Sequence, residues 1–348
     1  MKTPAVAALF LCLFTAAAGV AAPANSVRPA LREYDILRAF PPGRLAALSA
    51  GDIPDEKGFT GSNHAHGSWV ESGPQRGSCR AVIPAVVAGD LAAADHAWRG
   101  IDVAFSHQRA DGGFESKPAA NGKVSAAFDA NVETAYFFLQ ELGRALLVIA
   151  ESPHAAHFKD RIAALKPKLR RAADYIDSGY DTIIPKVGHS VNRVIIAAKA
   201  FGTCGVFLGD EKLIARSKKL IAHAITLRDK EGVFIENGGR DSSYNVVSIL
   251  FGSVLALHVP LPEFEAVLPA AVVWQLTRVL PSGEIDVNGN TRTGVGKEPD
   301  AFGKAKTVNY KEVVLALTIY GVVHQDKAAL AAADRVFAYS EQRGLTTK

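Results

Sequence analysis

This chain of 348 residues contains few cysteines and has a small net charge, and each of these facts excludes some classes of protein. There are three cysteines, and the formal net charge is +4. A balance this close to neutral is too weak for a protein that binds nucleic acid, but it is compatible with an acidic substrate. Cys12 lies in the leader described below, so only Cys79 and Cys204 could pair, and only in an oxidising compartment.

The chain also lacks an apolar run with the length and flanks of a membrane anchor. Its first residues combine one early lysine, a short run of small and apolar residues, and Ala-rich cleavage options near residues 21–24. This pattern predicts a secretory signal peptide over residues 1–24, because no stop-transfer cluster follows. Cys12 lacks the small preceding residue of a lipoprotein signal. We therefore expect export to the periplasm or beyond, with no membrane span.

No low-complexity tract interrupts the remainder, in which helical patterns follow one another with little sign of strands. Apolar helices, which should be buried on all sides, alternate with helices that have one polar face. The sequence predicts an all-α domain over residues 80–348. The predicted helices cover 82–105 with a break near Gly89, and then 130–150, 158–178, 191–207, 211–228, 243–257, 262–280, 310–323 and 327–343.

Residues 25–79 read differently and form a predicted N-terminal segment. A polar leader and a short helix are followed by a stretch rich in Gly, Ser, Pro and His, which predicts an irregular loop region. Long loops in compact domains often line a site. His64, His66 and Trp69 in this loop are therefore candidate substrate-binding residues.

Four links between helices resemble one another. HQRADGGFES, DSGYDTIIPKVGHS, LRDKEGVFIENGGRDSS and LPSGEIDVNGNTRTG each contain a glycine turn and a short apolar stretch, and each leads to an apolar helix. Their spacing of roughly 50 to 65 residues is that of a helical hairpin repeat. Such hairpins predict either an (α/α) toroid, incomplete or complete, or an open superhelix. Long polar links that converge at one end of an inner ring favour the toroid.

The motifs RADGGF, VGHSVNR and GGRDSSY each begin a supposed inner helix, and with them residues 80–345 resemble the (α/α)-toroid carbohydrate-active enzymes. These are the polysaccharide lyases and the six-hairpin glycosidases. The resemblance implies a site in which Tyr, His, Asn and Arg act together. Tyr244, His189, Asn192 and Arg193 stand at suitable places for those catalytic roles.

His189, Asn192 and Arg193 are spaced i, i+3 and i+4. A helix that begins near Ser190 would present them along one edge of its first turn. The N-terminus of a helix attracts anions, so this edge could seat a uronate carboxylate. The alternative is structural, with Arg193 paired to an acid and His189 acting as a cap.

The segment 228–258 places a second polar group before a buried helix. Asp241 is the best N-cap candidate, because its short side chain can accept from the free N–H groups of the first turn. Tyr244 could act as base and acid in a β-elimination if Arg240 or Arg193 stabilised its phenolate. The alternative is a buried tyrosine bonded to a loop carbonyl. Glu236, Asn237 and Arg240 are candidate substrate-binding residues, as are Arg292 and Tyr310 in the last repeat.

A hydrolase would instead need two carboxylates across the scissile bond. Acids that could supply them are Glu115, Asp129, Glu133, Glu236, Asp241 and Asp286. We expect no metal and no cofactor. The His64-x-His66 pair lacks a third ligand at a defined spacing, and the loop after Asp286 has Thr291 and Lys297 where a calcium hand needs Gly and Glu.

Three hypotheses follow. The first is an exported polysaccharide lyase that cleaves an acidic, uronate-containing glycan by metal-independent β-elimination. The second is an inverting glycoside hydrolase on the same scaffold, and the third is a non-catalytic glycan-binding protein. Prenyl-transferring and terpene-cyclising toroids are disfavoured by the export signal and by the lack of an acidic diphosphate-binding cluster. The identity of the glycan, endo or exo action and the oligomeric state stay open.

Overall fold

The computed structural model describes residues 31–117, 128–299 and 303–346. The predicted signal peptide lies outside these residues. Helices make up 68% of the structure and strands 4%, so the predicted all-α class is confirmed. The residues from Leu31 onward form one unit, and the predicted boundary at residues 79/80 falls inside its helix α4.

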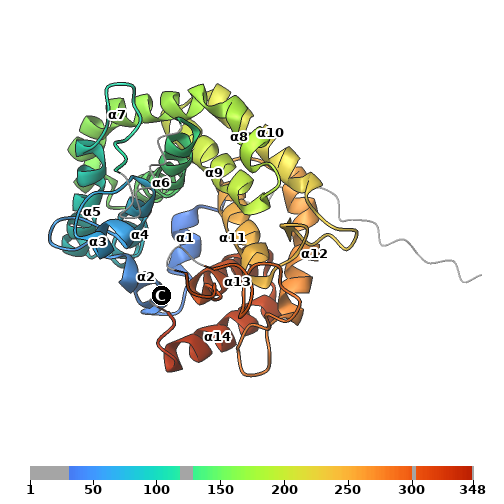
Figure 1. The fold of residues 1–348 in the computed structure, drawn as a ribbon. Helices are drawn as coiled ribbons and strands as arrows, with labels where there is room; N and C mark the ends of the chain where they lie inside the picture. The colour runs from blue at the N-terminus through green and yellow to red at the C-terminus, as the bar shows by residue number, and fades with distance from the viewer. Residues whose placement is uncertain (1–30, 118–127, 300–302, 347–348) are drawn as a thin grey trace, which may run out of the picture. The chain divides into compact units, whose positions relative to one another are not determined.

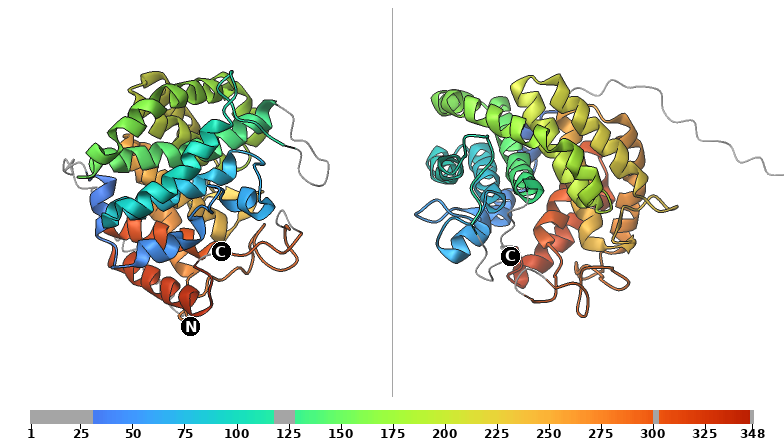
Figure 2. Two further views of the ribbon diagram at one scale, coloured as in Figure 1. Left: turned by 90° about the vertical axis from the view of Figure 1, so that its left-hand side faces the viewer. Right: turned by 45° about the horizontal axis from the view of Figure 1, so that its top comes forward.

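Five helices form an inner row in which each contacts the next along the chain. They are α4 (Arg76–Ala88), α6 (Phe128–Glu151), α9 (Val191–Leu208), α11 (Ser242–His258) and α13 (Tyr310–His324). Each inner helix also packs against the outer helix that follows it, as Figures 1 and 2 show. The outer helices are α5 (Leu91–Ser106), α7 (Lys159–Ser178), α10 (Glu211–Thr226), α12 (Pro262–Thr277) and α14 (Lys327–Gln342).

The burial of these helices follows the pattern in the sequence. In α11 every residue from Asn245 to Leu255 is buried, and α9 is buried from Val194 to Gly205. The outer helix α10 buries Leu213, Leu220 and Ile221 and exposes lysines on its other face. The apolar helices α9 and α11 are therefore buried on nearly all sides, whereas α10 has one exposed face.

The N-terminal segment is more helical than its composition suggests. It contains α1 (Glu33–Arg38), α2 (Arg44–Ser49), α3 (Gly61–His66) and the 3-10 turns η1 (Ala50–Asp52) and η2 (Gly73–Gln75). Helix α1 contacts α4, α6 and α13, so it connects the first and last members of the inner row. Figure 1 shows α1 among the inner helices. Two further short helices are η3 (Ala155–Phe158) and α8 (Tyr180–Val187).

Three of the four predicted links share one backbone turn. In each, an isolated bridge joins two residues six apart, namely Gln108 to Phe114, Arg228 to Phe234 and Val279 to Ile285. A glycine with φ of 85–90° sits in each turn, at positions 112, 232 and 283. An added Cβ at Gly112 or Gly283 would lie 2.1 Å from a carbonyl oxygen of the next outer helix. The second link differs, because its residues Tyr180–Val187 form α8.

A two-residue hairpin in the third link was predicted only as a loop. Strands β1 (Ile235–Glu236) and β2 (Gly239–Arg240) pair antiparallel. The turn between them is Asn237-Gly238, and both residues have positive φ, at 52° and 79°. An Asn-Gly pair is the usual sequence for a tight hairpin of this kind.

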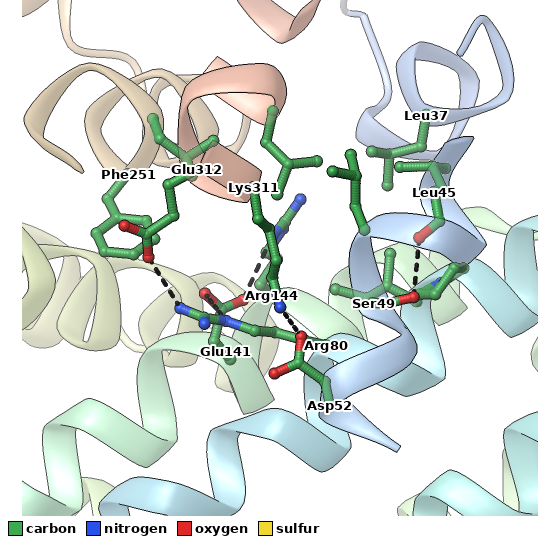
Figure 3. Close-up of a pocket in the computed structure, with 15 residues that line it drawn as sticks. Leu37, Leu45, Ser49, Asp52, Arg80, Glu141, Arg144, Phe251, Lys311 and Glu312 are labelled. Carbon is green, nitrogen blue, oxygen red and sulfur yellow. Dashed lines mark hydrogen bonds and ion pairs between the residues drawn. The ribbon is translucent and has the colours of Figure 1, made fainter. Parts of the chain in front are cut away.

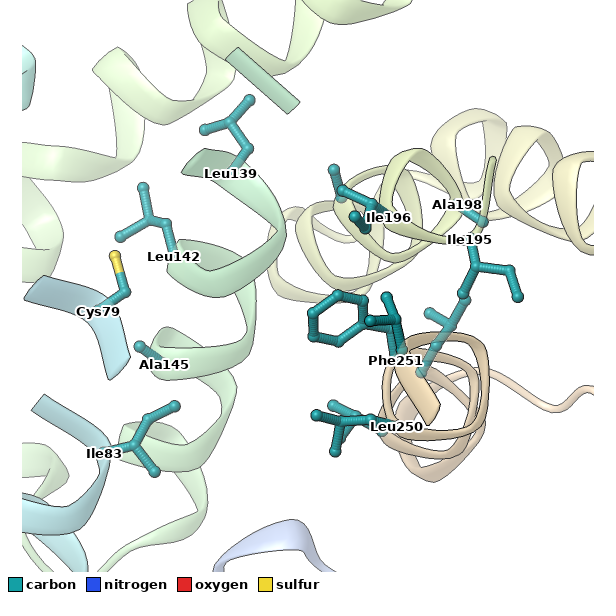
Figure 4. Close-up of a cluster of buried hydrophobic side chains, with 14 of the residues drawn as sticks. Cys79, Ile83, Leu139, Leu142, Ala145, Ile195, Ile196, Ala198, Leu250 and Phe251 are labelled. Carbon is teal, nitrogen blue, oxygen red and sulfur yellow. The ribbon is translucent and has the colours of Figure 1, made fainter. Parts of the chain in front are cut away.

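Both cysteines of the described residues are free thiols buried in the core. Cys79 of α4 packs in an apolar cluster with residues of α6 such as Leu142, as Figure 4 shows. Burial raises the pKa of the Cys204 thiol to about 12. The structure therefore does not contain the disulfide that the sequence left open.

One described helix, α9, is long and apolar enough by composition to span a membrane. It packs against α6, α10 and α11, and 78% of it is buried inside the unit. This is the usual situation of a core helix.

Candidate functional site

A cavity of about 360 Å³ lies where the first halves of the inner helices meet. Its volume falls within the range of roughly 300–1,000 Å³ that is typical of small-ligand pockets. All five inner helices contribute to it, together with the loop that precedes α13. The lining residues are Arg76, Arg80, Phe137, Gln140, Asn192, Ile196, Ser243, Tyr244, Val247, Phe251, Thr293, Lys306, Thr307, Asn309 and Glu312.

The charge of the lining is unbalanced, with three cations against one carboxylate. Arg80 is paired with Glu141 at 3.3 Å and with Glu312 at 3.7 Å. Lys306 is paired with Glu298 at 3.0 Å. Arg76 forms no ion pair with any residue that the structure describes, and one of its terminal nitrogens donates to the carbonyl oxygen of Gly73 at 3.1 Å.

Arg76 is therefore the cation best placed to meet an anion. Burial and the neighbouring Arg80 lower the pKa of its guanidinium. The same group lies 5.4 Å from the centroid of the Phe137 ring, which also lines the cavity. A carboxylate or phosphate beside Arg76 would relieve the repulsion between the two arginines and replace the water that burial has removed.

Tyr244 carries the phenol of the cavity. Its hydroxyl accepts a hydrogen bond from the ammonium of Lys306 at 3.2 Å, and the guanidinium of Arg292 lies 4.1 Å from its ring centroid. Both cations come from the loop before α13. Arg240, for which the sequence suggested this role, pairs instead with Asp229 and Glu231 at 2.5 and 2.7 Å.

Asp241 holds this part of the site together. One carboxylate oxygen accepts from the N–H groups of Ser243 and Tyr244, so its predicted role as N-cap is confirmed. The other oxygen accepts from the N–H groups of Arg292 and Thr293 at 2.9 and 2.8 Å. A single buried side chain therefore fixes both the start of α11 and the loop that supplies the cations.

Glu236 and Arg292, both predicted to bind substrate, lie behind the cavity wall. Glu236 is fully buried, and one of its carboxylate oxygens accepts from Arg292 at 2.5 Å. The hydroxyl of Ser190 lies 2.7 Å from that oxygen and 2.6 Å from the side-chain oxygen of Asn192. These contacts orient Asn192 in the lining and hold the guanidinium of Arg292 in contact with the ring of Tyr244. The pair supports the site from outside the cavity.

The structure separates the three residues expected on one edge of a helix. Helix α9 begins at Val191, so His189 precedes it and is exposed, outside the cavity lining. Asn192 and Arg193 are adjacent on the helix and point about 100° apart. Asn192 faces the cavity, whereas Arg193 points away and pairs with Glu133 at 3.4 Å.

The candidates in the N-terminal segment also lie outside the cavity lining. His64 and His66 are exposed on α3, where the sequence predicted an irregular loop, and His64 lies 2.9 Å from Asp55. Trp69 is 2% exposed, stacks on His107 with a centroid separation of 4.2 Å, and donates its indole N–H to the backbone carbonyl oxygen of Glu115. A buried indole offers no free face to a sugar.

The two remaining candidates, Asn237 and Tyr310, also lie outside the cavity lining. Asn237 is exposed at the tip of the β1–β2 hairpin. Tyr310 is 8% exposed and packs on Tyr339, and burial raises the pKa of its phenol to about 12. Its chain neighbour Asn309 lines the cavity in its place.

A buried ionic network that the sequence did not predict adjoins the cavity and shares Arg80 with its lining. The carboxylate of Glu141 is within 3.4 Å of three cations, Arg80, Arg144 and Lys199. Arg144 also reaches Glu33 of α1 at 2.6 Å. Burial opposes ionisation, but Lys199 and Arg80 hold the pKa of Glu141 well below its usual value. The available signal was the presence of charged residues inside otherwise apolar helices.

Two further acids, Glu71 and Glu133, lie close enough to Arg76 and Arg193, respectively, to be influenced by their charges. Burial raises the pKa of both Glu71 and Glu133, and the charge of Glu133 raises that of Glu71 further. Arg76 opposes the shift at Glu71, and Arg193 opposes it at Glu133. Either acid could keep a proton at a pH where an exposed carboxyl group has lost it.

No protein-family model matches this chain, and no curated protein matches it either.

Proposed function

We propose that this chain is an exported lyase that cleaves a uronate-containing glycan by metal-independent β-elimination in the cavity of Arg76 and Tyr244. The observation that carries the proposal is the guanidinium of Arg76, which forms no ion pair with a described residue, in a lining that also holds a phenol 3.2 Å from an ammonium group. The first group suits a substrate carboxylate. The second suits proton transfer.

The proposed scaffold is an incomplete (α/α) toroid of five helical hairpins. The neighbour-to-neighbour contacts of the inner row support it, as does the contact of α1 with both α4 and α13 at the ends of that row. In such a scaffold the links after the outer helices lead to the starts of the inner helices. This placement accounts for the lining of the cavity by residues from five separate helices.

The chemistry assigned to the residues follows from their charges. Arg76 and the amide of Asn192 bind the uronate carboxylate and stabilise the negative charge that develops when the adjacent carbon loses its proton. The phenolate form of Tyr244, stabilised by Lys306 and Arg292, removes that proton. The C–H electron pair forms the new C=C bond, and the bond to the glycosidic oxygen breaks. The departing oxygen takes a proton from Tyr244, which restores the phenolate.

This proposal replaces two of the catalytic residues expected from the sequence. His189 and Arg193 do not line the cavity, so Arg76 and Lys306 take their roles as cations near the substrate. Export is part of the proposal and rests on the predicted signal peptide over residues 1–24, which lie outside the described residues.

A hydrolase on the same scaffold is the second candidate, favoured by the raised pKa values of Glu71 and Glu133. Inverting hydrolysis needs one protonated carboxyl group as general acid and one carboxylate as base. Because the charge of Glu133 also raises the pKa of Glu71, Glu71 is the candidate for the acid and Glu133 the candidate for the base.

The test is an assay of the mature protein on a panel of uronic-acid polysaccharides, with alginate, polygalacturonate and hyaluronan as the first three. Elimination gives ultraviolet absorbance from the unsaturated product, and the activity survives a chelator. New reducing ends without absorbance support the hydrolase instead. Binding without either product supports a non-catalytic glycan-binding protein.

The Arg76→Gln variant tests whether Arg76 binds the substrate carboxylate. Loss of a charge-assisted hydrogen bond costs about 1.5–3 kcal/mol, which corresponds to a fall in kcat/KM of roughly 10- to 100-fold. Arg335→Gln is the matched control, because Arg335 is an exposed arginine of α14 outside the cavity lining. Equal activity in the two variants would contradict the proposed role of Arg76.

A further inference from the structure

Glu312 supplies the single carboxylate among the described residues that line the cavity. It is the third residue of α13, and its N–H donates to the side chain of the N-cap residue Asn309 at 3.2 Å. A glutamate at this position often accepts in return from the N–H of the N-cap residue. Here that N–H donates instead to the hydroxyl of Ser243, at 3.4 Å. The carboxylate of Glu312 is therefore not used to close the end of the helix.

The carboxylate of Glu312 is short of hydrogen-bond donors. Glu312 is 9% exposed, and its ion-pair partner, a terminal nitrogen of Arg80, lies 3.7 Å away. This separation is too long for a hydrogen bond. No residue in the described part of the chain donates a hydrogen bond to either carboxylate oxygen of Glu312. Since buried carboxylates normally accept hydrogen bonds, a donor group on a bound ligand would find a favourable partner here.

Arg80 has unused hydrogen-bond donors beside this carboxylate. Its Nε donates to Glu141 at 3.3 Å, and Figure 3 shows the guanidinium between Glu141 and Glu312. The two terminal nitrogens carry most of the N–H groups of an arginine. Those of Arg80 make no hydrogen bond with any residue that the structure describes. Arg80 and Glu312 thus present donors and acceptors side by side in the lining.

The two arginines of the lining therefore suit different groups. Arg76 forms no ion pair with a described residue, whereas Arg80 lies between two carboxylates that balance its charge. A substrate carboxylate at Arg80 would be repelled by Glu141 and Glu312. A hydroxyl group, in contrast, can donate to Glu312 and accept from Arg80 without adding charge. The pair consequently suits hydroxyl groups.

The surroundings of the pair fit a sugar ring. Arg80, Phe251 and Glu312 line both the cavity and an adjoining space of about 40 Å³, which is enough for a few water molecules. The aromatic ring of Phe251 offers apolar surface to the C–H groups of a sugar. Arg76 and Arg80 are spaced i, i+4 on α4, so their side chains leave the helix about 5–6 Å apart. A single uronate residue can span that distance.

We infer that Arg80 and Glu312 form a subsite for two neighbouring free hydroxyl groups of the uronate whose carboxylate binds Arg76. This subsite rests on the proposed function and adds to it the part of the sugar that selects the substrate. One hydroxyl donates to Glu312, and the other accepts from Arg80. In a 1,4-linked uronan the hydroxyl groups on C2 and C3 are free and adjacent. Methylation or acylation of either removes a donor, so the protein should discriminate against uronans substituted at these oxygens.

Calorimetry with the mature chain carrying Tyr244→Phe measures binding without turnover. The probes are galacturonate, mannuronate and guluronate disaccharides, their 2-O-methyl and 3-O-methyl ethers, and acetate as a carboxylate without a hydroxyl group. Glu312→Gln should weaken binding of the unmodified disaccharides about 10- to 100-fold, the usual effect of losing a hydrogen bond to a charged group. Acetate should bind equally well or more tightly, because the substitution removes a negative charge from the lining.

Glu341→Gln, an exposed change on α14, is the matched control and should leave every affinity unchanged. The methyl ethers need no change at Glu312, so they decide the matter even if Glu312→Gln fails to fold, and they should bind about 10-fold more weakly than the parent sugars. Equal binding of ethers and parent sugars, or disaccharide binding that Glu312→Gln does not weaken, would overturn the hydroxyl subsite and leave the proposed lyase intact. Absence of binding by every disaccharide would contradict the proposed function and the subsite together.

Discussion

The ammonium of Lys306 lies 3.2 Å from the phenolic oxygen of Tyr244, although 62 residues separate the two in the chain. Lys306 belongs to the arm formed by residues 292–299 and 303–309, which precedes α13. An isolated β-bridge pairs Pro299 with Ala305 within this arm. Arg292 and Lys306 both bind Glu298 of this arm, and the pKa of that carboxyl group is held at about 2, chiefly by its hydrogen bond from Arg292. The two cations beside the phenol therefore belong to the loop before α13, whereas the phenol belongs to the buried helix α11.

Removal of the Lys306 charge should slow the reaction more than it weakens binding. In Lys306→Gln the phenolate of Tyr244 loses its nearest cation, and we expect kcat to fall by about 10- to 100-fold, the equivalent of roughly 1.5–3 kcal/mol. Tyr244→Phe should cost more, about 10²–10⁴-fold, because it removes the acid and base itself. Steady-state kinetics of both variants measure this. Lys297→Gln, an exposed change in the same arm, is the control, and an equal loss there would assign the effect to the arm as a whole.

Neutralisation of Glu141 should destabilise the fold severely. Glu141→Gln leaves Arg80, Arg144 and Lys199 buried without their shared counter-charge, and we expect a loss of about 3–5 kcal/mol in the free energy of unfolding. Urea denaturation followed by circular dichroism measures it. Glu265→Gln on the exposed face of α12 should change stability by less than about 0.5 kcal/mol. Similar midpoints for the two variants would show that the network is dispensable.

Lys199 should make stability depend on alkaline pH. Burial lowers the pKa of its ammonium from 10.5 to about 8, although Glu141 opposes the shift. The folded protein therefore releases this proton near pH 8, and the unfolded chain releases it near pH 10.5. Between these values the unfolded state binds more protons, so this group makes the free energy of unfolding rise with pH.

Lys199→Met removes that contribution and supplies the comparison. Urea midpoints of both proteins, measured at intervals from pH 7 to pH 10, should diverge above about pH 8 in favour of the wild type. Parallel curves would show that Lys199 keeps its proton throughout this range.

Gly283 should not tolerate a side chain. Its φ is 90°, and an added Cβ would lie 2.1 Å from the carbonyl oxygen of Arg335, which must then move. Gly289 has a similar φ of 78° but nothing within 4 Å of the added carbon. Gly289→Ala should cost about 1 kcal/mol from backbone strain alone, and Gly283→Ala should cost clearly more. Thermal or urea unfolding of the two variants decides this, and equal losses would contradict the proposed steric cause.

Most of the helices could be predicted from the sequence, because their signals are local. The nine predicted helices after residue 80 correspond to α4–α7 and α9–α14, with the break at Gly89 separating α4 from α5. Asp241 was identified as a cap from its position alone. The sequence did not predict α3 or α8, since short helices with Gly, His or Pro carry a weak periodic signal.

The site was harder to predict, because it depends on which residues of distant helices face each other. His189 and Asn192 are close in sequence, yet the start of α9 at Val191 places only Asn192 in the lining. Arg76 and Lys306 both line the cavity although 230 positions separate them in the chain. Nothing in the local pattern of either residue distinguishes it from a solvated surface charge.

Helix α1 carries an implication for how the chain is made. Glu33 has no exposed surface, and its carboxylate is shared by Arg144 and by His258, which lies 225 residues further along the chain. Until α11 has been synthesised, this acid has no complete set of partners, and inserting it into apolar surroundings would be unfavourable. Helix α1, the first of the described helices, should consequently be among the last to dock, after the ribosome has translated most of the protein. Refolding from denaturant should show the same order, with amide protection of α1 acquired after that of α9 and α10.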